Sequence, residues 1–153
     1  MSPEEFRIEI CNLLTARELG EVVMEISAVD AKVAASQRHL QTCEQVLPTD
    51  PEAAVQLAYD AARKVLDANL LFVGLRVHQR GGSHGSYIKV AASTLFSQET
   101  WADLTWMRKL RNHSEYWDES LPPISLNQAK EAVSASLAMV DDGIRALKIL
   151  KDS

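Results

Sequence analysis

The segment from residue 50 to residue 73 constrains the fold most, because it predicts a helix that is apolar around most of its circumference. Asp50 followed by Pro51 is typical of an N-cap and the first helical position. Two apolar sides leave only a narrow polar strip, which consists of Gln56, Asp60, Arg63, Lys64 and Asp67. A helix with so little polar surface must be enclosed by neighbours. We therefore predict that it is the centre of a helical bundle and that four of its residues are nearly inaccessible: Leu57, Ala61, Val65 and Leu66.

Charged residues of this strip stand at spacings that suit ion pairs along one helix. Asp60 precedes Lys64 by four residues, and Arg63 precedes Asp67 by the same interval. Residues four apart are neighbours on a helix surface. The order of charges is favourable for Asp60 and Lys64 and is reversed for Arg63 and Asp67.

The two ends of the chain carry clear signals for helices. Ser2, Pro3 and Glu5 form a capping box with proline at the first helical position, and Gly20 is a candidate C-cap. Near the other end, Ser125 and Gln128 form a second capping box, and the apolar spacing continues to about residue 150.

Three more segments between these ends have helical spacing. Ser27 and Asp30 predict a capping box before a narrow apolar stripe that ends at Pro48. Further helices are expected over residues 86–96 and, capped by Thr100 with Asp103, over residues 101–117. The total is six helices without a convincing strand. The predicted fold is a single all-α domain of about six helices.

Composition limits the classes of function. The chain has 153 residues and a formal net charge of -5, so any contact with nucleic acid must come from a local basic patch. Cys11 and Cys43 lack metal-ligand spacing and are expected to be reduced and buried. The start MSPEEF is unlike a signal peptide, and no apolar run approaches the roughly 20 residues of a membrane span. These features indicate a cytoplasmic protein that needs no membrane, metal or cofactor.

The loop from residue 76 to residue 86, RVHQRGGSHGS, is the one local concentration of cationic groups. It contains Arg76, His78, Arg80 and His84 and leads into a predicted helix, whose N-terminal amides are suited to an anion. We hypothesise an anion or nucleic-acid contact at Arg76, Arg80 and His84. The alternative is a glycine-rich turn with solvated charges.

The segment WADLTWMRKLRNHSEYWD, residues 101–118, predicts a helix with two apolar sides. On one side, Leu104 and Met107 are followed by Arg108 and Arg111. His113 lies on the other side. Burying an arginine is costly unless a carboxylate or an anionic ligand is close. Glu115 stands four residues after Arg111, so an Arg–Glu pair at the edge of the core is the alternative to a ligand site.

Several stretches together resemble bacterial HEPN-domain proteins (higher eukaryotes and prokaryotes nucleotide-binding). They are ARELGEVVMEISAVDAKVAASQRHL, LAYDAARKVLDANLLFVGLRV, GGSH and RKLRNHSEY, and they cover roughly residues 19–147. The resemblance implies an all-α homodimer, often encoded beside a nucleotidyltransferase antitoxin in toxin–antitoxin or phage-defence loci. Active members are metal-independent ribonucleases in which four to six residues lie between an arginine, often followed by asparagine, and a histidine.

The chain departs from this motif at the residue expected to act as the base. Aligned on Arg111 and Asn112, the position of the histidine is Tyr116, whose phenol has a reference pKa of about 10 and is a poor base near neutrality. A second frame, Arg108 to His113, does satisfy the spacing. The alternative for His113 is a structural role, as a histidine buried in the core on the apolar side of the helix.

Two functional hypotheses follow, beside a purely structural helical dimer. The first is a dimeric module that binds RNA, a nucleotide or a partner protein without cleavage, through a cleft shaped by Arg111, Asn112, Glu115 and Tyr116. The second is a ribonuclease toxin that uses Arg108, Arg111 and His113. Because one bundle rarely covers a helix with two apolar sides, we expect the 101–117 helix at the two-fold axis of a homodimer.

Overall fold

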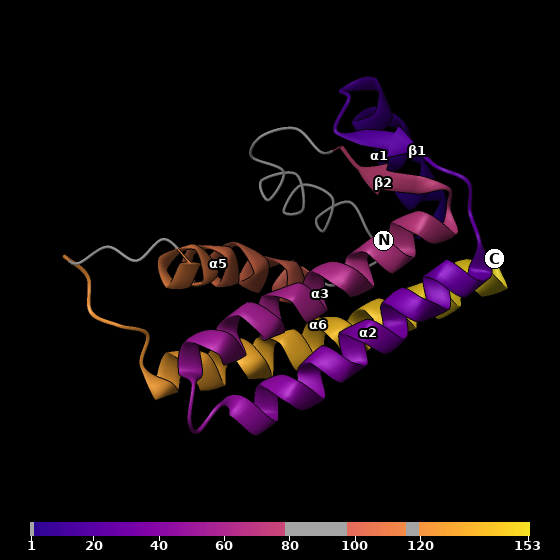
Figure 1. The fold of residues 1–153 in the computed structure, drawn as a ribbon. Helices are drawn as coiled ribbons and strands as arrows, with labels where there is room; N and C mark the ends of the chain where they lie inside the picture. The colour runs from indigo at the N-terminus through magenta and orange to yellow at the C-terminus, as the bar shows by residue number, and fades with distance from the viewer. Residues whose placement is uncertain (1, 79–97, 116–119) are drawn as a thin grey trace.

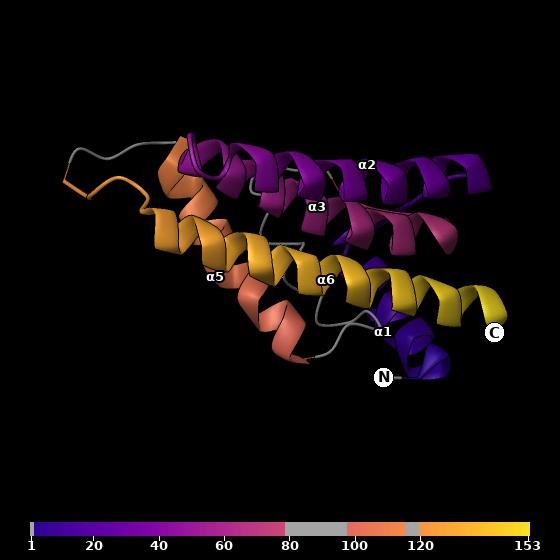
Figure 2. The ribbon, with the colours of Figure 1, turned by 90° about the horizontal axis from the view of Figure 1, so that it is seen from below.

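The computed structural model describes residues 2–78, 98–115 and 120–153, with side chains described for residues 103–113 of the second range. The fold is an all-α bundle, as predicted. Three long helices, α2 (Ile26–Val46), α3 (Pro51–Phe72) and α6 (Leu126–Asp152), run alongside one another, and α5 (Gln98–Glu115) packs against α3 and α6 (Figure 1). Seen from below, α5 crosses α6 obliquely (Figure 2). The predicted helix over residues 86–96 lies outside the described residues.

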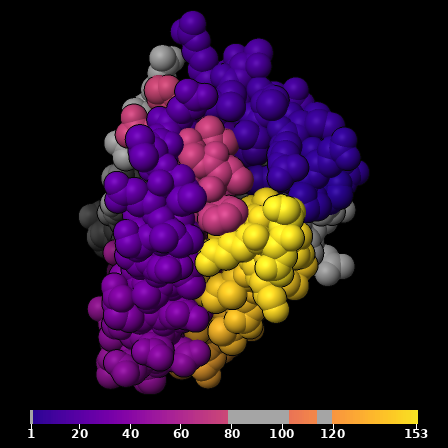
Figure 3. Space-filling view, turned by 90° about the vertical axis from the view of Figure 1, so that its right-hand side faces the viewer, coloured from indigo at the N-terminus to yellow at the C-terminus, as the bar shows by residue number. Residues whose placement is uncertain are grey.

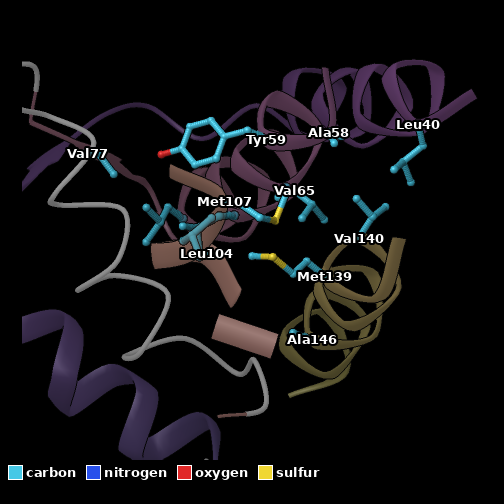
Figure 4. Close-up of a cluster of buried hydrophobic side chains, with 14 of the residues drawn as sticks. Leu40, Ala58, Tyr59, Val65, Val77, Leu104, Met107, Met139, Val140 and Ala146 are labelled. Atoms are coloured by element: carbon cyan, nitrogen blue, oxygen red, sulfur yellow. The ribbon is translucent and has the colours of Figure 1, made fainter. Parts of the chain in front are cut away.

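Helix α3 is the centre of the bundle, because α2, α5 and α6 all pack on it. Ala61, Val65 and Leu66 are buried as predicted, but Leu57 is only partly buried. Position 57 lies between the side of α3 that faces α2 and the exposed polar strip, so α2 covers it incompletely. The centre of the core is drawn in Figure 4.

Serine hydroxyls fix the close approach of the helices around α3. Ser36 of α2 donates to the carbonyl of Ala61 at 2.8 Å, and Ser136 of α6 donates to the carbonyl of Ala58 at 2.6 Å. Asn69 donates to the carbonyl of Gly143 on α6 at 3.0 Å. Small residues on α3 leave its carbonyls within reach of neighbouring side chains, and these bonds set the register of the bundle.

Asp60 of α3 pairs with another cation than the Lys64 suggested by the four-residue spacing. Asp60 pairs with Arg63 at 3.4 Å, and Asp67 pairs with Lys32 of α2 at 3.9 Å. Residues three apart are also neighbours on a helix, and α2 brings Lys32 within reach of Asp67. The neighbouring helix therefore supplies Asp67 with a cation that the spacing within α3 does not show.

The N-terminal part of the chain contains a short sheet that the apolar spacing did not predict. Helix α1 (Pro3–Thr15) is followed by β1 (Leu19–Glu21), which pairs antiparallel with β2 (Leu75–Val77). Gly20 is thus a strand residue opposite Arg76, and Ala16 is the C-cap of α1. The expectation of no strand was wrong, since three-residue strands are too short to show alternation. Figure 3 shows α1 and β1 beside the C-terminal end of α6.

Three of the five predicted helix starts are confirmed. Ser2 and Ser125 form capping boxes, and the Asp50 side chain accepts from the amide of Ala53. Helix α2 instead begins after Glu25 without a side-chain cap, and α5 begins at Gln98, so Thr100 is an internal residue. A serine or threonine near a helix start therefore does not by itself identify the N-cap residue.

Leucine and methionine side chains on both apolar sides of α5 are buried by the chain itself. Leu104 and Met107 are 0% exposed in the main core, and Leu110 packs with Val55, Ile124, Ala129 and Ala132. These three residues do not need a second copy to cover them, whereas Trp106 and His113, on the same side as Leu110, are only half-buried. Among the described helices, none combines the length and apolar character of a membrane span.

Candidate functional site

The candidate site is an arginine cluster, by which we mean Arg63, Arg108 and Arg111 around Tyr59. The Tyr59 ring is 0% exposed at the edge of the core, and in Figure 4 its hydroxyl points away from Val140 and Leu40. The Arg111 guanidinium lies over this ring, with its carbon 5.7 Å from the ring centroid. A cation over an aromatic face is attracted by the ring quadrupole.

The electrostatics of Tyr59 identify all members of the cluster. Burial raises the pKa of its phenol, while the positive charges of Arg63, Arg111 and Arg108 act in the opposite direction. Three guanidinium groups are therefore close enough to this phenol to favour its ionised form. The raised pKa keeps Tyr59 protonated near neutrality.

Two helices bring these side chains together. On α3, Arg63 stands one turn after Tyr59, where the polar strip meets an apolar side. On α5, Arg108 and Arg111 lie next to the buried residues Leu104 and Met107. Because apolar burial fixes α5 against α3, the arginines are placed by rigid elements rather than by a loop.

Arg108 has a buried donor that lacks a hydrogen-bond partner among the described residues. The Nε of Arg108 is buried and makes no hydrogen bond within the described part of the chain. Asp60, at 3.4 Å from Arg63, supplies one carboxylate to the edge of the cluster. A buried N–H without an acceptor is costly, and an oxygen anion that reached this Nε would relieve that cost.

His113 lies on the α6 side of α5 rather than above Tyr59. Its Nε2 is 2.7 Å from the carbonyl oxygen of Pro122, and its Nδ1 is buried without a hydrogen-bond partner among the described residues. A carbonyl only accepts, so Nε2 carries the proton and the lone pair of neutral His113 is on the buried Nδ1. Proton abstraction from a ribose hydroxyl requires that lone pair to be reached, and here it is not exposed.

A pocket of about 330 Å³ lies beside His113. Its walls include Trp106, Lys109, Leu121 and Gln128. It faces away from Tyr59, so the structure assigns Arg111 and His113, two members of the predicted catalytic set, to different sides of α5.

The remaining predicted site residues do not form one group. Asn112 is half-buried on α5, whereas the exposed Arg76 lies in β2, with its Nε 3.8 Å from the position a Cβ would take on Gly20. The predicted contacts of Arg80, His84, the Glu115 side chain and Tyr116 lie outside the described residues. Sequence reasoning missed Tyr59 and Arg63 as site residues, although their one-turn spacing at the edge of the polar strip was a usable signal.

Comparison with known proteins adds no family. Neither a protein-family model nor a curated protein matches this chain. The arguments for its function therefore depend on the residues and their geometry.

Proposed function

We propose that this chain is a helical module that binds the phosphate of a nucleotide or RNA at the arginine cluster and does not cleave it. The observation that carries the proposal is the convergence of Arg63, Arg108 and Arg111 on one buried tyrosine in a chain of net charge -5. Arginine is suited to phosphate because its planar donors bind two oxygens at once.

The chemistry of His113 supports binding without turnover. Cleavage of RNA without a metal requires a base for the 2′-hydroxyl, and the lone pair of neutral His113 is on its buried Nδ1, while Nε2 faces the Pro122 carbonyl. The arginines alone supply charge stabilisation but no proton acceptor. The cluster thus has the features of a binding site more than those of a ribonuclease centre.

The resemblance to HEPN-domain proteins extends this proposal to assembly and context. On that basis we propose a cytoplasmic homodimer from a toxin–antitoxin or phage-defence system, with a nucleotidyltransferase as partner. Light scattering of the purified protein is expected to give the mass of a dimer. A monomer at micromolar concentration would contradict the dimer and leave the phosphate site standing.

Binding is tested with a fluorescent single-stranded oligoribonucleotide and with a mononucleotide as competitor. Arg108→Gln and Arg111→Gln are each expected to weaken oligonucleotide binding about fivefold and to lower the salt slope by about one. The matched control is Lys109→Gln, an exposed cation on the same helix that lines the His113 pocket. Equal affinity in wild type and both arginine variants would overturn the proposal.

Cleavage is tested by incubating the protein with mixed RNA in EDTA, with His113→Ala alongside. No cleavage is expected from either protein. Cleavage by the wild type that disappears in the variant would establish the ribonuclease alternative, with Arg108, Arg111 and His113 as its residues.

A further inference from the structure

A histidine of α2 stands next to the arginine cluster, across the line of contact between α2 and α3. These helices are antiparallel and joined by a short turn, and Lys32 of α2 pairs with Asp67 of α3 at 3.9 Å. His39 and Asp60 each lie two helical turns from that pair, in the matching directions along the two helices. The geometry therefore sets His39 opposite Asp60.

The charges around His39 agree with this position. Partial burial is the main cause that lowers its pKa, and Lys64 and Arg38 lower it further while Asp60 acts in the opposite direction. Asp60 also pairs with Arg63 of the arginine cluster. Asp60 thus connects His39 and Lys64 on one side with the arginines on the other.

The residues form a row across three helices on one face of the bundle. Starting from α2, the row is His39, Lys64, Asp60, Arg63, and then Arg108 and Arg111 of α5. Both ends of the row are cationic or can become so, and Asp60 in the middle is neutralised by Arg63. A ligand with a single phosphate fills only one end of such a row, whereas a polynucleotide backbone presents phosphates to both.

We propose that His39 and Lys64 form a second phosphate subsite, which continues the arginine cluster toward α2 and binds a polynucleotide more tightly when His39 is protonated. This inference rests on the proposed function, because it extends the same site. In the free protein, Lys64 and Arg38 oppose protonation of His39. A bound phosphate adds negative charge there and favours the protonated form. By linkage, affinity must then rise as pH falls through the interval between the free and bound pKa values.

The test uses a mixed-sequence oligoribonucleotide without a terminal phosphate, since the second ionisation of a phosphomonoester near pH 6 would add its own pH dependence. Affinity is measured at constant ionic strength between about pH 8 and about pH 5.5. The wild type is expected to bind on the order of three- to tenfold more tightly at the acidic end. His39→Gln should remove most of this increase, and Lys64→Gln should weaken binding at every pH.

The matched control is Lys32→Gln, which removes a cation from α2 two turns away, where Asp67 already pairs with it. It should retain the pH dependence of the wild type. A second readout is the His39 resonance in NMR, whose pKa should move upward on addition of the oligoribonucleotide.

The outcomes separate the two proposals. If His39→Gln keeps the pH dependence, or if the His39 pKa does not move, the second subsite is wrong; loss of affinity in Arg108→Gln would still support the arginine cluster. Binding that needs His39 and Lys64 but not the arginines would support the subsite and overturn the proposed function. Absence of binding by the wild type at every pH would overturn both.

Discussion

Truncation of Leu104 tests how α5 is held. This side chain is 0% exposed and packs with Met107 in the main core, so its apolar contacts come from the same chain. Leu104→Ala removes a buried isobutyl group and leaves a cavity, which costs about 2–5 kcal/mol in well-packed cores. We expect about 3 kcal/mol, because helices on two sides restrict collapse of the cavity. For a domain of this size that lowers the melting temperature by roughly 6–12 °C.

The measurement is urea unfolding followed by circular dichroism, at two protein concentrations about a hundredfold apart. The control is Lys109→Ala on the exposed side of the same helix, where a change within about 0.5 kcal/mol is expected. The effect of Leu104→Ala should be the same at both concentrations, because one chain covers the residue. A loss below about 1 kcal/mol, or an effect that grows on dilution, would refute the reasoning and indicate that a second copy completes the packing of α5.

Four further predictions concern single residues. Gly74→Ala should destabilise the fold by about 1–2 kcal/mol in thermal unfolding, since Gly74 has φ of +78° and a Cβ there would lie 3.3 Å from the Val22 carbonyl; a neutral effect would contradict the strain argument. Ser125→Ala should cost about 1 kcal/mol through loss of the α6 capping box, and an unchanged unfolding midpoint would exclude this role. Burial raises the pKa of the Cys43 thiol to about 11, whereas Cys11 is exposed, contrary to the expectation that both cysteines are buried. Mass spectrometry after alkylation of the folded protein near pH 8 should therefore find Cys11 modified and Cys43 intact; equal labelling would mean that the core opens readily. The pKa of His39 is lowered in the folded state, so the unfolded chain binds a proton at this residue first as pH falls below about 6.5. The free energy of unfolding should therefore decline below that pH, and His39→Gln should reduce the decline. Parallel curves of stability against pH for the two proteins would refute the lowered pKa of His39.

The sequence by itself determined the helical class and the central place of α3. A helix that is apolar around most of its circumference must be enclosed by neighbouring helices. Asp50, Ser2 and Ser125 mark helix starts through local hydrogen bonds. Such features depend on residues close in the chain, which is why they were predictable. The β1–β2 pair was not, since its stability comes from residues more than fifty positions apart.

Only the tertiary structure decided which charged groups share a site. The sequence drew attention to Arg108, Arg111 and His113 on one helix, but the packing of α5 turns Arg111 toward Tyr59 and His113 toward Pro122. Arg63 joined the cluster through the contact of α3 with α5, and His39 came opposite Asp60 through the antiparallel register of α2 and α3. Electrostatic interactions act through space over a few ångströms, and the spacing of residues along a chain does not reveal the rotation of one helix against another.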